Sequence, residues 1–328
     1  MSKERHVPVL LNETIEFLRV RAGGTYVDCT LGLAGHSTEI AKLLGPEGHL
    51  IAFDRDAQAL ALAKARLDEV CQELGTQAPK VTLVNEAFSS LLKHIELASV
   101  DGLMADFGVS SLQLDEADRG FSFRADGPLD MRMDTRQSPT AAQVVNEEDE
   151  HELANLIYEY GEERRSRRIA RAIVSGRPLS TTGELARLVA SAAPAMKSDK
   201  IHPATRTFQA LRIFVNRELD EIKALLEAAP GVLKPSGRLA VISFHSLEDR
   251  IVKDSLRDGA QLGVWEILTR KPATASEEEM RRNPRSRSAK LRAAEKTGVR
   301  DQGSGIRDQG SGISKQKASG RKPAGYFK

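Results

Sequence analysis

The chain has 328 residues with 40% hydrophobic content, 29% charged content and a formal net charge of +2, which predicts a globular protein of about two domains. No apolar run approaches the roughly 20 residues that span a bilayer, and residues 7–11 are too short for a signal-peptide core, so we expect a cytoplasmic protein that contacts no membrane. Cys29 and Cys71 fit no disulfide or metal-ligand spacing, which predicts reduced thiols and no metal.

The first recognisable unit is a strand, a glycine-containing turn and a helix over residues 24–44. Its strand is a β-branched and aromatic run that ends in Asp28. The turn contains the first candidate ligand-binding residues, Gly32, Ala34, Gly35 and His36. Glycines let the main chain approach a ligand, and the following helix points free N–H groups and the positive end of its dipole at it. The alternative is that these glycines serve only the turn.

A second predicted strand, residues 49–54, indicates the kind of ligand. It ends in Asp54, whose carboxylate can accept hydrogen bonds from both ribose hydroxyls of an adenosine cofactor. The turn is not G-x-G-x-x-G, because Ala34 replaces a glycine and no third glycine follows, which weakens a pyrophosphate-binding interpretation. A carboxylate at Asp28 aimed at the cofactor would repel a diphosphate but suits an ammonium and a sulfonium, which favours S-adenosylmethionine.

Strands and helices alternate up to about residue 110. The pattern predicts helices at 57–74 and 89–97 and strands at 80–84 and 100–106. Alternation implies parallel strands, whose carboxyl ends share one ligand crevice. The residues expected there are Asp28, Asp54, residues 85–88 and Asp106. Phe88 can lie against an adenine, although ordinary core packing is the alternative.

The middle of the chain predicts a helical insertion. Residues 107–134 lack clear periodicity but hold too many Phe, Leu and Met residues for disorder, which favours a functional loop. Helical patterns then cover residues 140–145, 147–160, 162–174 and 185–192, the last behind a capping box at Thr181. The third helix carries five arginines that suit phosphate contacts or, alternatively, form a solvated face paired with Glu162 and Glu163: Arg164, Arg165, Arg167, Arg168 and Arg171.

The α/β pattern resumes after residue 203. Apolar spacing predicts one long helix over 205–228, and residues 237–246 indicate a buried strand with a polar exit at Ser243 and His245. Apolar runs at 264–268 and 289–294 are candidates for closing the sheet.

The carboxyl-terminal part is strongly basic. Residues 270–328 hold sixteen Lys and Arg against six Asp and Glu, and a duplicated Arg-Asp-Gln-Gly-Ser-Gly sequence lies within residues 298–328. This composition cannot bury enough apolar surface to fold, so we expect a disordered tail over 298–328. It is either a nucleic-acid tether or simply a solvated tail.

Seven long motifs lie within about residues 6–296: His6-x-Pro-Val-Leu-Leu, Asp28-x-Thr-x-Gly-x-Ala-Gly-His36, Asp106-Phe-Gly-Val-Ser-Ser-Leu-Gln-Leu-Asp115, Arg119-Gly-Phe-Ser-Phe, Asp126-Gly-Pro-Leu-Asp-Met-Arg-Met-Asp134, Thr205-Arg-Thr-Phe-Gln-Ala-Leu-Arg-Ile-x-Val-Asn216 and Ser243-Phe-His-Ser-Leu-Glu-Asp249. Together these motifs resemble one family, the RsmH (MraW) 16S ribosomal RNA cytosine-N(4) methyltransferases. Two positions depart from the family pattern and bear on loop geometry: Ala34, where glycine is frequent, and Leu112, where proline is usual.

The resemblance implies an α/β fold of the class I methyltransferase (Rossmann-like) type, a sheet flanked by helices with an inserted all-helical domain. The expected divisions are residues 1–112 and 204–297 for the methyltransferase domain, 113–203 for the substrate-recognition insertion and 298–328 for the tail. The implied substrate is 16S rRNA at the decoding centre of the small ribosomal subunit. By motif position, the resemblance places S-adenosylmethionine on Ala34, Gly35, His36, Asp54, Phe88, Asp106 and Gln113.

The chemistry of a cytosine amine sets further expectations. Its lone pair is delocalised into the ring, so a site must align the amine with the sulfonium methyl and accept hydrogen bonds from its N–H groups. The candidate acceptors are Asp106, the main-chain carbonyls of Gly108 and Val109, Ser243 and His245. Two other classes stay open: a nucleic-acid-binding or assembly protein that holds S-adenosylmethionine without turnover, and a NAD(P)-dependent oxidoreductase, both disfavoured by Asp28, Asp54 and the Ser-Ser-x-Gln sequence.

Overall fold

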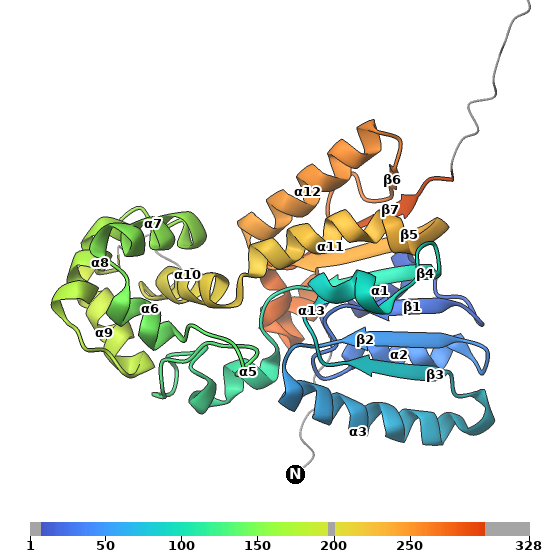
Figure 1. The fold of residues 1–328 in the computed structure, drawn as a ribbon, viewed down its shortest axis with the longest axis horizontal. Coiled ribbons are helices and arrows are strands. Elements are labelled where there is room, and N and C mark those ends of the chain that lie inside the picture. Colours follow the sequence, from blue (N-terminus) through green and yellow to red (C-terminus); the bar gives the residue numbers. More distant parts are fainter. Residues whose placement is uncertain (1–7, 196–200, 299–328) are drawn as a thin grey trace, which may run out of the picture. The chain divides into compact units, whose positions relative to one another are not determined.

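A seven-stranded sheet forms the centre of the computed structural model, which describes residues 8–195 and 201–298 (Figure 1). Within those residues the strand order is β3-β2-β1-β4-β5-β7-β6. Strands β1 to β5 are parallel, and β7 runs antiparallel to β5 and β6. The bounds are β1 Thr25–Asp28, β2 His49–Phe53, β3 Lys80–Val84, β4 Val100–Asp106, β5 Leu233–Ser243, β6 Trp265–Ile267 and β7 Lys290–Lys296. The predicted α/β class is confirmed, as is closure of the sheet by the two late apolar runs.

Alternate residues of each strand belong to two different apolar cores, one on each face of the sheet. In β4, Leu103 packs into one core and Met104 into the other. The first core is covered by α4 (Leu91–His94), α11 (Glu218–Val232) and α12 (Ser246–Gln261). The second is covered by α1 (Leu11–Leu18), α2 (Gly35–Leu44) and α3 (Ala57–Leu74). Burial on both faces explains why the strands read as nearly continuous apolar runs.

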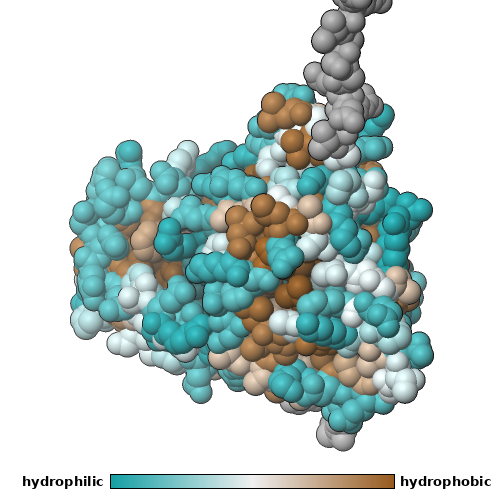
Figure 2. Space-filling model, turned by 45° about the vertical axis from the view of Figure 1, so that its right-hand side comes forward, coloured by the Kyte–Doolittle hydropathy of each residue, from teal (hydrophilic) through white to brown (hydrophobic). Residues whose placement is uncertain are grey.

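The helices between β4 and α11 have an apolar core of their own, which includes Leu153, Ile169 and Phe208. They are α5 Ser111–Asp115, α6 Ala141–Glu147, α7 Glu150–Gly161, α8 Ser166–Ser175, α9 Thr182–Ala192 and α10 Thr205–Asn216 (Figure 1). The predicted capping box at Thr181 begins α9. Figure 2 shows mainly hydrophilic residues over this helical part, whereas apolar residues gather in a band across the middle of that face of the molecule. The apolar core of these helices therefore forms among the helices themselves.

The predicted domain boundaries at residues 112, 203 and 297 stay predictions. The described residues up to Gly298 belong to one compact unit. The predicted disordered tail lies outside the described residues, apart from Gly298. Among the described residues, no helix is both long and apolar enough to cross a membrane.

The prediction of one long helix over residues 205–228 was wrong. The helix ends at Asn216, and Arg217 takes a left-handed conformation (φ 51°) before α11 begins. The Asn216 amide donates to the carbonyl of Met131 at 2.7 Å, and its carbonyl oxygen accepts the N–H of Met133 at 2.7 Å. This break turns α10 toward the helical part and α11 toward the sheet.

Several other elements differ from the predicted bounds. The predicted helix 89–97 is a short 3-10 turn, Phe88–Ser90, followed by the single turn of α4. Strand β5 ends at Ser243, and His245 is the N-cap of α12. Helix α12 was not predicted from the sequence. The remaining elements are α13 Glu277–Arg282 and the 3-10 turns Gly75–Gln77, Ala117–Arg119 and Pro284–Ser288.

Candidate active site

A cavity of about 650 Å³ opens at the carboxyl ends of the parallel strands, within the size range of small-molecule sites. The structure brings nine of the predicted site residues into its wall: Gly32, Gly35, His36, Asp54, Phe88, Asp106, Gly108, Val109 and Gln113. Four others do not line it: Asp28, Ala34, Ser243 and His245. These four were expected at the site, and each has a structural reason for its position.

Asp28 holds the turn after β1 together and does not face the cavity. The residue is 1% exposed. Its Oδ1 accepts the N–H of Thr30 at 3.0 Å, and its Oδ2 accepts the Ser37 hydroxyl at 2.7 Å. Burial raises the pKa of this carboxyl, which the two hydrogen bonds partly offset. The expectation of a carboxylate aimed directly at the cofactor does not match this placement.

Ala34 serves the turn by its backbone. It takes a left-handed conformation (φ 59°), and its N–H donates to the carbonyl of Leu31 at 2.7 Å. A side chain in this region costs about 1 kcal/mol, which explains why a glycine would suit this position. At Gly35, by contrast, an added Cβ would lie 2.6 Å from Cγ of Pro8, so close packing requires that glycine.

Asp54 lines the cavity, and its carboxylate has hydrogen-bond acceptor positions that the described part of the protein does not use. Its Oδ2 accepts the N–H of Gly32 at 2.8 Å, and its Oδ1 accepts the N–H of Asp56 at 2.8 Å. An ionised carboxylate has about four acceptor positions, so two hydroxyl donors can still bind. Burial, against these two hydrogen bonds, raises the pKa of Asp54 to about 6.

Asp106 offers an unused acceptor to the cavity. Its Oδ1 is buried and has no hydrogen-bond partner among the described residues. Its Oδ2 lies 4.0 Å from Nδ1 of His36, whose Nε2 is 3.1 Å from the carbonyl of Val9. Burial raises the pKa of Asp106 well above its usual range, and the negative charges of Asp28 and Glu248 add to this. A cationic or N–H-bearing ligand would satisfy this carboxyl.

Among the charged residues of the cavity wall that were not predicted from the sequence, three lie close together: Arg212, Glu218 and Glu248. Nε and Nη2 of Arg212 donate to the two carboxylate oxygens of Glu218, each at 2.8 Å. Burial opposes ionisation of Glu248, but His245 and Arg212 outweigh it and lower the pKa of this carboxyl. The carboxyls of Asp106 and Glu248 therefore differ, because the pKa of Asp106 is raised and that of Glu248 is lowered.

His245 does not line the cavity itself but contacts Glu248, which does. Its Nε2 lies 2.9 Å from Oε1 of Glu248, and Oε2 of Glu248 accepts the N–H of Phe244 at 2.7 Å. Ser243 lies behind the cavity wall, with its hydroxyl donating to the carbonyl of Lys290 at 3.4 Å. The spacing His245-x-x-Glu248 is that of a capping box, a local signal that would have found Glu248.

One group of described residues has the composition of a metal site. Ligand atoms of Glu218, His245 and Glu248 lie within 4.8 Å of one another. The bidentate guanidinium of Arg212 already contributes a positive charge there. The sequence-based expectation of no metal stays a prediction.

Phe88 and Gln113 both line the cavity. The Phe88 ring centroid is 6.0 Å from that of Phe107, and it provides an apolar surface suited to an aromatic ligand. Two hydrogen bonds hold the Gln113 side chain in place. Its amide donates to Asp56 at 2.9 Å, and its carbonyl oxygen accepts the N–H of Ser110 at 3.0 Å. Gly108, at φ 95°, makes the turn that brings the segment after β4 to the cavity.

Comparisons with known proteins agree with this geometry. The model of the MraW methylase family matches residues 3–297. Relatives named "Ribosomal RNA small subunit methyltransferase H" are 69% identical in Acidobacterium capsulatum, over 90% of this chain and 100% of the relative, and 61% identical in Koribacter versatilis, over 88% and 93%. The relative of the same name in Sorangium cellulosum is 51% identical over 90% of this chain and 92% of its own.

These similarities confirm the resemblance seen in the sequence motifs, and with it a methyltransferase that uses S-adenosylmethionine. The family match includes both the sheet and the helical insertion, since it begins before α1 and ends after β7. The chain belongs to the MraW methylase family.

Proposed function

We propose that this cytoplasmic enzyme transfers the methyl group of S-adenosylmethionine to the exocyclic N4 amine of a cytosine in 16S rRNA, at the decoding centre of the small ribosomal subunit. Relatives up to 69% identical carry the name of a small-subunit ribosomal RNA methyltransferase. The observation that supports the proposal most directly is the unused acceptor of Asp106 in the same cavity as Asp54.

The residues present fit S-adenosylmethionine. Asp54 has acceptor positions for the two ribose hydroxyls, and Phe88 offers an apolar face for the adenine. The turn over Gly32 and Gly35 and the beginning of α2 line the same side of the cavity. Acidic groups at Asp106 and Glu248 suit a ligand that carries positive charge at its sulfonium and ammonium groups.

When bound, the cofactor supplies an electrophilic methyl group on a sulfonium. This methyl group would pass from the sulfur to the amine nitrogen, and the amine would release one proton to solvent water. We assign Asp106 the acceptor that orients an amine N–H, with the carbonyls of Gly108 and Val109 as its neighbours in the wall. Glu248, kept ionised by His245 and Arg212, is a further carboxylate of the cavity wall and stabilises positive charge that develops on the amine.

Mapping methylation on small-subunit RNA tests the proposal. RNA from cells that lack this protein is expected to miss one N4-methylation at the decoding centre, and the purified protein is expected to restore it with labelled S-adenosylmethionine. The alternative, an assembly protein that holds the cofactor without turnover, predicts cofactor binding by equilibrium dialysis and no methyl incorporation.

Replacing Asp54 by alanine is expected to weaken cofactor binding by about 1 to 3 kcal/mol, because the ribose hydroxyls lose their acceptor. Isothermal titration calorimetry measures the change. Asp68→Ala is the matched control, since Asp68 is an exposed carboxylate on α3 that forms an ion pair with Lys64. Equal cofactor affinities of the Asp54→Ala and wild-type proteins would remove Asp54 from the site.

The raised pKa of Asp54 predicts a pH dependence of binding. Its carboxyl titrates at about pH 6 in the cofactor-free protein, and the ionised form is the better acceptor for hydroxyl donors. Cofactor affinity is therefore expected to fall as pH decreases below about 6 and to be nearly constant above pH 7. Calorimetry between pH 5 and 8 checks this, with Asp54→Asn as the comparison. The same profile in both proteins would assign the titration to another group.

A further inference from the structure

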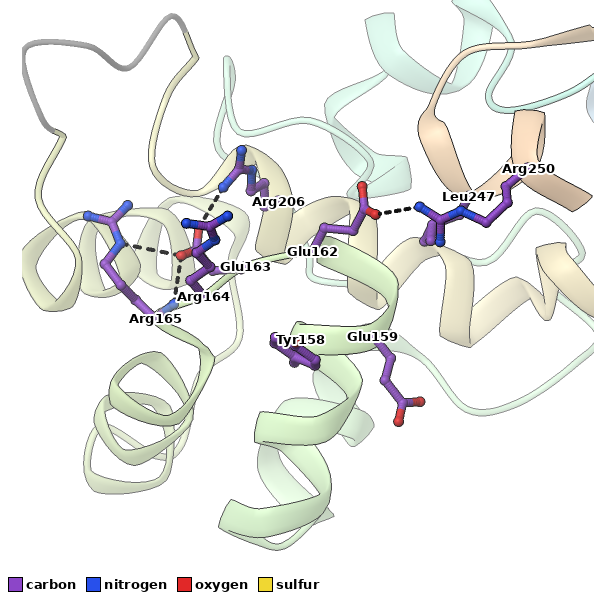
Figure 3. A pocket seen from close by; sticks show the side chains of 9 residues that line it. All are labelled: Tyr158, Glu159, Glu162, Glu163, Arg164, Arg165, Arg206, Leu247 and Arg250. Atoms are coloured by element: carbon purple, nitrogen blue, oxygen red, sulfur yellow. Dashed lines mark hydrogen bonds and ion pairs between the residues drawn. The ribbon is translucent and has the colours of Figure 1, made fainter.

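A second cleft, of about 840 Å³, is lined by residues other than those of the cavity and is rich in arginine. It is lined by the end of α7, the connection to α8, and the first turns of α10 and α12: Tyr158, Glu159, Glu162, Glu163, Arg164, Arg165, Arg206, Leu247 and Arg250. Figure 3 shows Arg164, Arg165 and Arg206 grouped above Tyr158 and Arg250 apart from them beside Glu162. The Glu159 carboxylate points away from the grouped arginines. The proposed reaction uses none of these residues.

One buried acid fixes two of the arginines. Glu163 is 2% exposed, and its Oε1 accepts the main-chain N–H of Arg165 at 2.9 Å and the guanidinium Nε–H of the same residue at 3.3 Å. Its Oε2 lies 3.7 Å from Nη1 of Arg206. Arg165 also donates to the carbonyl of Pro194 at 2.7 Å. These contacts hold two guanidinium groups in place and leave some of their N–H donors for a ligand.

Arg164 is different, because it makes no hydrogen bond or ion pair within the part of the chain that the structure describes, and it is exposed. On the opposite side of the cleft, Arg250 pairs with Glu162 at 3.2 Å. Helices α8, α10 and α12 all begin beside the cleft, so the positive ends of three helix dipoles add to the charge of Arg164. The cleft therefore favours an anion.

Tyr158 narrows the class of anion. Its side chain is 59% exposed, although a large aromatic ring is normally at least partly covered by the protein. An exposed aromatic ring beside arginines is the arrangement with which proteins hold single-stranded nucleic acid, since the base stacks on the ring and the cations contact the phosphate. An inorganic anion has no base that could stack on the ring.

The cleft adjoins the methyl-transfer cavity. Thr205 lines the cavity and the next residue, Arg206, lines the cleft. In α12 the same holds for Glu248 and Leu247. A polynucleotide with one base in the cavity can therefore continue into the cleft across the first turns of α10 and α12.

We propose that this cleft binds a nucleotide that flanks the methylated base in single-stranded RNA, with the flanking base stacked on Tyr158 and its phosphate at Arg164 and Arg206. The inference rests on the proposed RNA substrate and adds a second contact site to it. It also divides the arginines of the segment, because Arg164 and Arg165 line the cleft, whereas Arg167 and Arg168 do not.

Two probes test the two halves of the proposal on the full-length protein: a five-residue oligocytidylate and an abasic ribose-phosphate oligomer of the same length. Tyr158→Ala is expected to weaken oligocytidylate binding by about 5- to 150-fold and to leave binding of the abasic oligomer unchanged. Tyr158→Phe keeps the stacking surface and is expected to retain the wild-type affinity. Fluorescence anisotropy measures both.

Arg164→Ala is expected to weaken both probes and to lower the slope of log affinity against log salt by about 0.7, the value for one phosphate contact on a single strand. Arg168→Ala is the matched control, an exposed arginine on α8 outside the cleft, and is expected to change neither quantity. Equal losses for both probes in Tyr158→Ala, or an unchanged salt slope in Arg164→Ala, would overturn the proposal.

Cofactor affinity and methyl transfer to small-subunit RNA, measured on the same proteins, separate this inference from the proposed function. If the cleft binds no nucleotide, the wild-type protein still methylates RNA, and the variants do so with unchanged KM. If the proposed function fails, the wild-type protein itself gives no methylation.

Discussion

Replacing Asp106 by asparagine is expected to slow single-turnover methyl transfer by about 100- to 1,000-fold at saturating cofactor and RNA. The variant keeps the size of the side chain but replaces one carboxyl oxygen by an amide group, which can present a donor where the amine also donates. Losing one preorganised electrostatic contact at a reacting group typically costs this much. Rapid-quench measurement of labelled RNA gives the rate.

Ser243→Ala is the matched control, since Ser243 leaves the neighbouring strand at the same edge of the sheet but lies outside the cavity wall. We expect its single-turnover rate to stay within about threefold of wild type. Cofactor affinity of Asp106→Asn, measured separately, shows whether the carboxylate also binds the cofactor. A wild-type rate in Asp106→Asn at saturation would transfer the acceptor role to the carbonyls of Gly108 or Val109.

The composition of the cavity wall was largely predictable because parallel strands end at one edge of the sheet. Asp54, Phe88 and Asp106 follow three different strands, and all three line the cavity. Asp28 ends a fourth strand but turns inward, because Ser37 and Thr30 bind its carboxylate. Strand position is readable in a sequence, whereas the direction of a terminal side chain depends on hydrogen bonds that form only in the folded chain.

The helix break at Arg217 was not predictable from local pattern. Apolar residues continue at helical spacing across it, and neither glycine nor proline marks the end. The break is held by hydrogen bonds from Asn216 to Met131 and Met133, which are more than 80 residues away in the chain. Arg212 and Glu218 lie on either side of this break and meet because of it. Since the break was not predicted, their ion pair was missed as well.

Arg212→Met is expected to destabilise the protein by about 3 to 5 kcal/mol. Arg212 and Glu218 are 16% and 7% exposed at their side chains, and the guanidinium binds both carboxylate oxygens. Removing the cation leaves Glu218 buried without compensation near Glu248, and breaking a buried pair from one side typically has this cost. Urea denaturation followed by circular dichroism measures the free energy of unfolding.

Two further variants identify the cause of that loss. Lys223→Met removes an exposed cation of α11, 3.7 Å from Asp220, and is expected to change stability by less than about 1 kcal/mol. Adding Glu218→Gln to Arg212→Met removes the uncompensated charge, so the double variant is expected to be more stable than Arg212→Met alone. If the second substitution instead adds its own full loss, the two side chains act independently. The position of the break between α10 and α11 would then depend on Asn216 rather than on this ion pair.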